Sequence, residues 1–248
     1  MNFSLKSTAS MLAAAALLAA CNSGDEATAG AAEAGADSNL KAAEGSENWV
    51  RTIAKTEEGG YRIGNPDAPV KLVEFASLAC PHCATFHEEA MPELKGEYIA
   101  SGDVSYELRT FVLNQPDFVV TAVARCQTPE AFFALADAFF ENQRGWLGNF
   151  QQMERADLER LGTMDPQDAM VEFGRMGGVD EFVRARGIPG SKFESCVRDE
   201  ETLAEVEAIR QDAVETYDLT GTPTFVVNGE RIDASTWEQV KERLDAAL

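Results

Sequence analysis

Residues 69–87 read PVKLVEFASLACPHCATFH, and the fold can be inferred outward from this stretch. Its first nine residues are mostly apolar and rich in β-branched side chains, which is typical of a buried strand. From Cys83 onward, Phe86, Ala90 and Leu94 recur at helical spacing, so a helix is expected to begin within the cysteine motif. The stretch therefore predicts a strand that runs directly into a helix N-terminus, with two cysteines at the junction.

The segments on either side predict alternating strands and helices. A hairpin is expected from Trp49–Lys55 and Tyr61–Ile63, and a strand from residues 104–111. The region from Phe118 to about Tyr217 has helical patterning throughout. The chain then ends with TPTFVV, an Asn-Gly turn, a short strand and a last helix. These elements predict an α/β sandwich with about a hundred helical residues inserted before the final hairpin.

Local signals predict three finer features of the helices. Pro92 is expected to kink the first helix, because proline lacks a backbone donor and its ring crowds the preceding turn. Ser235 and Glu238 are expected to form a capping box at the start of the last helix. The residues expected to line the buried face of the preceding long helix are Leu203, Val206, Ala213 and Tyr217.

Three kinds of chemistry would explain Cys80 and Cys83. Structural zinc commonly has four ligands, but the chain holds no second pair of this kind, and only a site completed by His87 can be imagined. A structural disulfide across two residues would close a very small loop and stabilise the fold little. Thiol exchange is favoured, because a helix N-terminus and the neighbouring His82 would both stabilise the thiolate of Cys80.

The motif CPHC at 80–83 after a strand, a helical insertion, and a later Thr222-Pro223 before a strand resemble the DsbA family of thioredoxin-fold thiol oxidoreductases. The resemblance covers residues from about 59 to 248. It implies a thioredoxin-like αβ sandwich with an inserted all-helical subdomain. The corresponding segments are the N-terminal part of the domain at 49–115, the helical insertion at 116–217 and the C-terminal part at 218–248.

The resemblance also implies roles for the four residues of the cysteine motif. Cys80 would be the exposed nucleophile, and Cys83 would be the resolving partner. Pro81 and His82 would stand between them as catalytic-site residues, and the choice of this dipeptide is among the more specific variants of the motif. No cofactor and no metal are implied.

Three further residues acquire roles from the same resemblance. A cis peptide bond would precede Pro223 and pack against the cysteine pair, while Thr222 would offer backbone groups to a client chain. Glu74, six residues before Cys80, would be a buried acid beneath the disulfide. The alternative for Glu74 is the polar side of an edge strand, because alternation alone does not determine which face it occupies.

The predicted function is that of a disulfide donor of the cell envelope, and two alternatives stay open. Threonine at position 222 is also found in isomerases, so the protein could instead be a disulfide isomerase or reductase kept reduced by a membrane partner. It could also be a non-enzymatic copper chaperone, because soft thiolates suit Cu(I). The expected partners are reduced secreted client proteins and a membrane thiol oxidase, or reductase, that resets the pair.

The N-terminus predicts export and attachment to a membrane. Residues 1–20 combine one lysine with a short apolar run, which is the build of a signal peptide, and Leu-Ala-Ala before Cys21 resembles a bacterial lipobox. Ordinary cleavage near Ala20 is the alternative. Residues 21–48 hold no aromatic side chain and predict a flexible acidic tether rather than an Ala-rich helix. The protein is therefore expected in the periplasm as a lipoprotein. It is also expected to be a monomer, because isomerases of the superfamily associate through a folded N-terminal segment and the segment expected here is a tether.

Cys126 and Cys196 are the only cysteines left once Cys21 is lipidated and the motif is paired. Export to an oxidising compartment would couple them as a structural disulfide. Two separate buried cysteines are the alternative.

The charge of the chain limits its partners. The formal charge is −21, and loss of residues 1–20 would make it −22. Nucleic acid and anionic lipid surfaces are poor partners for such a molecule, so no nucleic-acid binding is expected.

Overall fold

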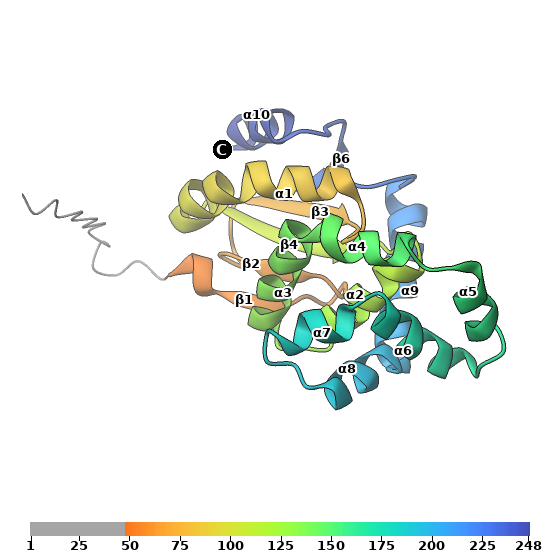
Figure 1. Ribbon diagram of the computed structural model, residues 1–248. Coiled ribbons are helices and arrows are strands. Elements are labelled where there is room, and N and C mark those ends of the chain that lie inside the picture. The colour runs from red at the N-terminus through yellow and green to blue at the C-terminus, as the bar shows by residue number, and fades with distance from the viewer. Residues whose placement is uncertain (1–47) are drawn as a thin grey trace, which may run out of the picture. The chain divides into compact units, whose positions relative to one another are not determined.

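The computed structural model describes residues 48–248 (Figure 1). The predicted signal peptide at 1–20, the lipidation site Cys21 and the predicted tether up to residue 47 lie outside the described residues. Within residues 48–248, no helix is both long enough and apolar enough to cross a membrane.

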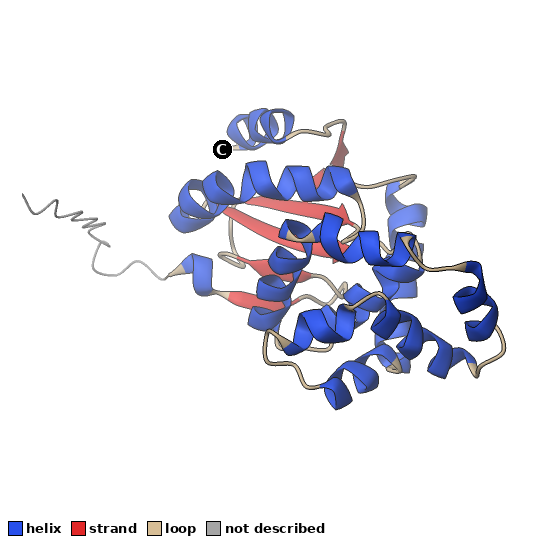
Figure 2. Cartoon of the chain, in the orientation of Figure 1, coloured by secondary structure: helices blue, strands red, loops and turns tan. Residues whose placement is uncertain are grey.

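A mixed sheet forms the centre of the structure, with helices packed against it (Figure 2). The spatial order of its strands is β1-β2-β4-β3-β5-β6. Strands β3 and β4 are parallel, and every other neighbouring pair is antiparallel. The strands are β1 (Ile53–Lys55), β2 (Tyr61–Ile63), β3 (Val70–Ala76), β4 (Val104–Thr110), β5 (Thr224–Val227) and β6 (Glu230–Ile232). The central position of β3 and β4 explains why their side chains are almost all buried, as is usual for parallel strands covered on both faces.

The helices fall into two groups. Those outside the insertion are η1 (Trp49–Arg51), α1 (Pro81–Glu93), η2 (Leu94–Ile99) and α10 (Trp237–Ala247). Those between β4 and β5 are α2 (Gln115–Arg125), α3 (Pro129–Glu141), α4 (Gln143–Gln151), α5 (Arg155–Leu161), α6 (Pro166–Met176), α7 (Val179–Arg184), α8 (Gly190–Val197) and α9 (Glu200–Tyr217). The helical insertion expected from the sequence is present, and its division from the flanking segments at 116 and 217 stays a prediction.

Aromatic packing attaches the insertion to the sheet. The ring of Tyr61 on β2 stacks on Phe132 of α3 at a centroid distance of 3.7 Å. The Tyr61 hydroxyl donates a hydrogen bond of 2.9 Å to the backbone oxygen of Arg125 at the end of α2. Both partners are buried, so the insertion shares one continuous core with the sheet.

Local details both confirm and correct the sequence-based expectations. The first hairpin is confirmed, but Trp49–Arg51 forms a short 3-10 helix rather than part of its strand. At Pro92 the helix is not interrupted, and π-helical bonding begins two residues later in η2. Leu203 was expected to be buried, but it is 51% exposed because α9 turns that side to solvent at its start.

The predicted capping box of α10 was wrong by one residue. Thr236, not Ser235, is the N-cap, and its side chain accepts a hydrogen bond from the backbone of Gln239. The Gln239 side chain in turn accepts a hydrogen bond of 2.8 Å from the backbone N–H of Ser235. Serine and threonine are both good N-caps, so local sequence did not distinguish the two positions.

Candidate active site

The cysteine motif lies at the junction of β3 and α1. Cys80 has extended backbone angles and is the N-cap of α1, and Pro81 occupies the first helical position, where a missing N–H costs nothing. Cys83 follows in the first turn and is fully buried, whereas Cys80 keeps 6% of its surface exposed. Both side chains are free thiols. The arrangement gives the two sulfur atoms different access to solvent, with Cys80 the more accessible.

The surroundings of Cys80 stabilise its thiolate. The pKa of Cys80 is lowered from an ordinary 9.0 to about 5, chiefly by a hydrogen bond from the Cys83 thiol. Burial opposes this shift, while the Thr222 side chain and the backbone N–H groups of Cys83 and His82 add to it. These N–H groups are free because they belong to the first turn of α1. Cys80 is therefore a thiolate at neutral pH.

Cys83 titrates in the opposite direction. Burial raises its pKa well above the ordinary value, and its hydrogen bond to Cys80 and the charge of Glu74 add to the effect. One sulfur of the pair is therefore charged and the other protonated when both are reduced. This asymmetry is the one that a nucleophile and a resolving cysteine require.

The peptide bond between Thr222 and Pro223 is cis and lies against the cysteine pair. The Sγ atom of Cys80 is 3.3 Å from the backbone oxygen of Thr222. The Thr222 hydroxyl is buried and has no partner other than Cys80 among the described residues, so it is available to the Cys80 sulfur anion. The Thr222 backbone thus faces the nucleophile, where it is available to a bound chain.

Glu74 lies on β3 between the neighbouring strands β4 and β5, so an edge-strand position for it is wrong. Its side chain is 1% exposed, and one carboxylate oxygen accepts a 2.7 Å hydrogen bond from the Tyr106 hydroxyl. The other oxygen has no partner among the described residues. Burial raises the pKa of Glu74 to about 8, so the group is mostly neutral at pH 7.

Two buried polar residues hold the loop before Cys80, and sequence analysis missed both. Gln143, the first residue of α4, donates hydrogen bonds of 2.8 Å to the Leu78 oxygen and 2.9 Å to the Cys80 oxygen. Asp117 of α2 accepts a 2.6 Å hydrogen bond from the Ser77 hydroxyl, and burial raises its pKa to about 6. The insertion therefore fixes the backbone from which the nucleophile projects.

No sequence signal could have identified Gln143, because it lies 63 residues from Cys80 and sits in an ordinary polar helix start. Asp117 follows the N-cap Asn114 and could have been recognised as a first-turn acid. Its complete burial beneath the catalytic loop depends on tertiary packing.

Cys126 and Cys196 form a disulfide, with their Cα atoms 5.5 Å apart. Cys126 is the C-cap of α2, and Cys196 is fully buried in α8. The bond joins two helices of the insertion and so corresponds to the pairing expected from the sequence. Within residues 48–248, no group of three or more His, Cys, Asp or Glu side chains is arranged to hold a metal ion. His87, the third ligand imagined for zinc, has its Nε2 atom 2.9 Å from Asp137.

A sheet with a CPHC pair at a helix N-terminus, opposite a cis-proline, defines a thioredoxin-like protein. A family model described as "Thioredoxin" matches residues 56–246, so the chain belongs to the thioredoxin family. The expected α/β thioredoxin-like sandwich with a helical insertion is thereby confirmed. The expected resemblance of the chain to DsbA-like oxidoreductases is confirmed as well.

Several relatives are named for disulfide chemistry. A protein of Rickettsia prowazekii named as a protein-disulfide oxidoreductase is 25% identical over 200 residues, which cover 80% of this chain and 65% of the relative. This chain thus spans less than two thirds of that relative's length. Disulfide bond formation protein D of Bacillus subtilis is 23% identical over 193 residues, covering 75% of this chain and 76% of the relative.

Solved structures share the fold. The protein-disulfide isomerase from Novosphingobium aromaticivorans matches with a TM-score of 0.70 and 28% identity, over 75% of this chain and 95% of that chain. Wolbachia pipientis alpha-DsbA1 matches with a TM-score of 0.60 and 20% identity, over 76% of this chain and 90% of that chain.

Proposed function

We propose that the protein is a thiol:disulfide oxidoreductase that donates a Cys80–Cys83 disulfide to the thiols of client proteins. The observation that carries this proposal is the position of Cys80 as the N-cap of α1, beside the buried Cys83 and the cis Thr222-Pro223 bond; this setting lowers the pKa of Cys80 to about 5. A stable thiolate makes the reduced pair more stable, and a more stable reduced form makes the disulfide a stronger oxidant.

The exchange has two steps, each an attack of a thiolate on a disulfide sulfur. A client thiolate attacks Sγ of Cys80, the bond to Cys83 breaks, and the electron pair leaves on Cys83, which takes up a proton. A second client thiolate then attacks the client sulfur of the mixed disulfide, and Cys80 leaves as a stable thiolate. The client loses two electrons, and the pair gains them.

Two residues assist these steps in the proposed mechanism. Glu74, with a pKa of about 8, is mostly neutral at pH 7, so it does not place a second charge beside the leaving sulfur of Cys83. The Thr222 backbone, next to Cys80 Sγ, offers its hydrogen-bonding groups to the client chain.

The location and partners of the protein follow from the same proposal. We infer that residues 1–20 direct export, that Cys21 is lipidated, and that residues 21–48 tether a monomeric domain to a membrane in the periplasm. Its clients would be reduced secreted proteins, and a membrane thiol oxidase would restore the disulfide.

A second candidate function is disulfide isomerisation or reduction. The similar protein from Novosphingobium aromaticivorans is named a protein-disulfide isomerase, which favours this alternative. The same cysteines would then be kept reduced by a membrane partner. A non-enzymatic copper chaperone would instead carry metal on these thiolates.

Two variants test the exchange itself. Cys80→Ser should reduce oxidation of a dithiol peptide to the uncatalysed rate, because it removes the accessible sulfur. Cys83→Ser, mixed with the disulfide-linked dimer of a one-cysteine peptide, should accumulate a mixed disulfide: Cys80 attacks the peptide disulfide, one peptide leaves as a thiolate, and no resolving thiol releases the other. Activity that survives in Cys80→Ser would contradict the assignment.

Trapping the redox state in cells separates the candidates. Rapid acid quenching followed by alkylation should find Cys80 and Cys83 mainly oxidised if the protein is a donor. A mainly reduced pair would favour the isomerase or reductase, and metal-loaded protein would favour the chaperone.

A further inference from the structure

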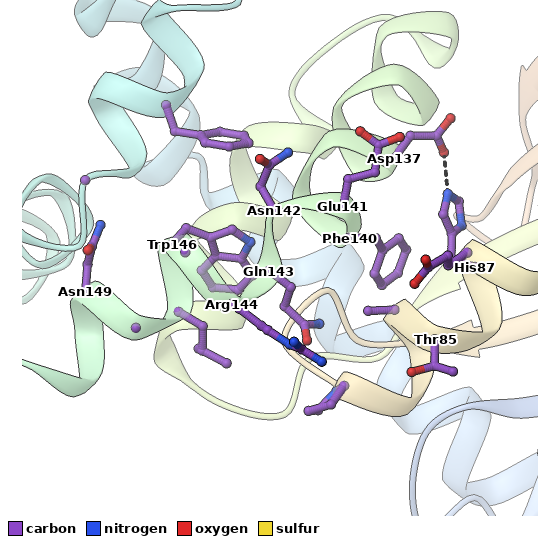
Figure 3. Close-up of a pocket in the computed structure, with 18 of the residues that line it drawn as sticks. Thr85, His87, Asp137, Phe140, Glu141, Asn142, Gln143, Arg144, Trp146 and Asn149 are labelled. Atoms are coloured by element: carbon purple, nitrogen blue, oxygen red, sulfur yellow. Dashed lines mark ion pairs between the residues drawn. The ribbon is translucent and has the colours of Figure 1, made fainter.

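A cleft of about 1530 Å³ runs along one side of α1 (Figure 3). Ala84, His87, Glu88 and Met91 line it from α1 at positions that share one face of a helix. The opposite wall comes from residues 137–151, at the end of α3 and in α4. Its volume exceeds the roughly 300–1,000 Å³ of typical small-molecule pockets. The size therefore suits a segment of polypeptide.

The cleft begins beside the redox pair. Pro81, which follows the nucleophile directly, is part of its lining. Gln143 also lines it and donates a hydrogen bond to the backbone oxygen of Cys80. A chain bound in the cleft would therefore contact side chains that directly adjoin the backbone of Cys80.

The cleft and the cis-proline strand occupy different faces of α1. Phe86, on the other face of the helix, packs against Phe225 of β5 at a centroid distance of 4.5 Å and against Trp237 of α10. In Figure 1, α10 and α4 accordingly lie on opposite sides of α1. A client joined to Cys80 would thus have the Thr222–Pro223 backbone on one side and the cleft on the other.

The carboxylates of the cleft are not all neutralised. Asp137 is paired with His87, at 2.9 Å, and with Lys95, at 3.0 Å. Figure 3 shows the contact with His87 joining the two walls, with Glu141 next to Asp137. Glu88 and Glu141 are exposed and form no ion pair with any residue in the described part of the chain. The cleft therefore presents free negative charge.

One cation and several apolar side chains complete the lining. Arg144 is exposed and likewise unpaired among residues 48–248, but it is outnumbered by the two free carboxylates. Met91, Phe140 and Trp146 supply apolar surface at the base. An acidic rim above apolar groups suits lysine or arginine, whose aliphatic stems pack on apolar surface while their charged ends stay in water.

We propose that this cleft binds the client polypeptide beside the cysteine being oxidised and favours segments that carry lysine or arginine close to that cysteine. The inference rests on the thiol exchange proposed for Cys80 and adds a sequence preference to it. The chain's overall charge of −21 also attracts cationic peptides. A test must therefore distinguish the effect of the cleft carboxylates from the effect of the overall charge.

The first experiment compares two dithiol peptides that differ only in having lysine or alanine three residues from a cysteine. With oxidised glutathione present to restore the Cys80–Cys83 disulfide after each turnover, wild-type protein should oxidise the lysine peptide with the higher kcat/KM. Glu88→Gln/Glu141→Gln should lower the ratio of kcat/KM for the lysine peptide to kcat/KM for the alanine peptide by roughly 3- to 10-fold, from two exposed charge interactions. The difference should shrink as salt is added.

The control variant removes two charges elsewhere. Glu159→Gln/Glu242→Gln alters two exposed carboxylates that form no ion pair within residues 48–248 and do not line the cleft. It should retain the lysine preference. Equal rates for the two peptides in wild type, or an equal loss in both double variants, would overturn the proposal.

A second experiment locates the bound chain. Cys83→Ser is treated with the disulfide-linked dimer of a lysine peptide that carries one cysteine and a photoreactive side chain three residues away, so that Cys80 forms a mixed disulfide with one peptide and the other leaves as a thiolate. Cross-links should map to residues 84–91 and 143–151, and cross-links confined to β5 and α10 would contradict the cleft. If wild type oxidised neither peptide nor dithiothreitol, the proposed function would fail. If it oxidised both peptides alike, only the cleft proposal would fail.

Discussion

One cysteine of each pair lies at the end of a helix, at the N-terminus in the first pair and at the C-terminus in the second. Cys80 is the N-cap of α1, where free backbone N–H groups stabilise a sulfur anion. Cys126 is the C-cap of α2, where the helix dipole disfavours an anion, and its partner Cys196 is fully buried. The comparison teaches that helix position and burial suit one pair to exchange and the other to a permanent bond.

The two cysteine pairs also differ in the length of the loop that their disulfide closes. Cys80 and Cys83 have two residues between them, whereas Cys126 and Cys196 are separated by 70 positions. A disulfide stabilises a fold mainly by restricting the unfolded chain, and more so for a longer loop. Loop closure by the first pair therefore contributes little to stability, while loop closure by the second disulfide contributes much.

The largest effect is expected from removing the second disulfide. Cys126→Ser/Cys196→Ser should lower the free energy of unfolding by up to roughly 4 kcal/mol, the chain-entropy value for a loop of this length. Dithiol oxidation at low temperature should keep its rate, because neither residue is part of the catalytic loop. Urea unfolding and a peptide oxidation assay check the two halves. Lost activity with unchanged stability would make the second pair a redox site and break the comparison.

The next effect concerns the acid beneath the redox pair. A carboxyl group whose pKa rises on folding stabilises the fold fully below its unfolded value, 4.5, and this stabilisation is lost as pH rises through about 8. Glu74→Gln should remove this dependence on pH from the stability of the oxidised protein, in which burial still raises the pKa of Glu74 but the charge of Cys80 no longer contributes. The oxidised form is required because the Cys80 thiolate gives the opposite slope in the reduced form, with stability lost as pH falls through 5.

Urea unfolding of the oxidised protein between pH 6 and pH 9 would measure this dependence of the free energy of unfolding on pH. Below that range Asp117, whose pKa burial raises to about 6, adds a dependence of the same sign. Glu159→Gln, at an exposed site, is the matched control and should retain the dependence seen in the wild type. A wild-type slope that persists in Glu74→Gln would show that another group titrates.

A smaller effect is expected from loosening the catalytic loop. Gln143→Met keeps the length of the side chain but removes both donors, so it should destabilise the fold by about 1–3 kcal/mol. It should also raise the pKa of Cys80, because the loop that positions the sulfur is no longer held. Gln151→Met, at an exposed position of the same helix, is the control and should change neither quantity. An unchanged Cys80 titration in Gln143→Met would show that α1 alone positions the sulfur.

The smallest effect is expected at His82. Its backbone N–H contributes to the low pKa of Cys80, and that group survives in His82→Ala. The imidazole is exposed, so its loss should raise the pKa of Cys80 by less than about half a unit. Ultraviolet titration of the thiolate measures the shift. A change of more than about one unit would show that the imidazole, rather than the helix N-terminus, mainly stabilises the Cys80 thiolate.

The junction of β3 and α1 could be predicted because its signals are local. An apolar β-branched run, a cysteine motif and helical spacing follow one another within residues 69–94. The resemblance of CPHC and Thr222-Pro223 to a known family then supplied contacts that lie far apart in sequence. The positions of Glu74 and the cis bond were anticipated in this way.

Features that depend on how the insertion packs could not be predicted. The hydrogen bonds of Gln143 span 63 and 65 residues, and the cleft exists only because α3 and α4 lie beside α1. Leu203 fits the apolar stripe of α9, yet it is 51% exposed, so the neighbouring elements within residues 48–248 cover it only in part. Periodicity identifies a face of a helix but not what covers it.

The comparison of the two pairs is tested most directly by one redox titration. The folded protein is equilibrated with mixtures of reduced and oxidised glutathione, quenched with acid, alkylated and mapped by mass spectrometry. We predict that Cys80 and Cys83 exchange between disulfide and dithiol across these mixtures, while Cys126–Cys196 stays oxidised throughout. If Cys126–Cys196 were reduced together with the first pair, or before it, helix position and burial would not explain which pair exchanges.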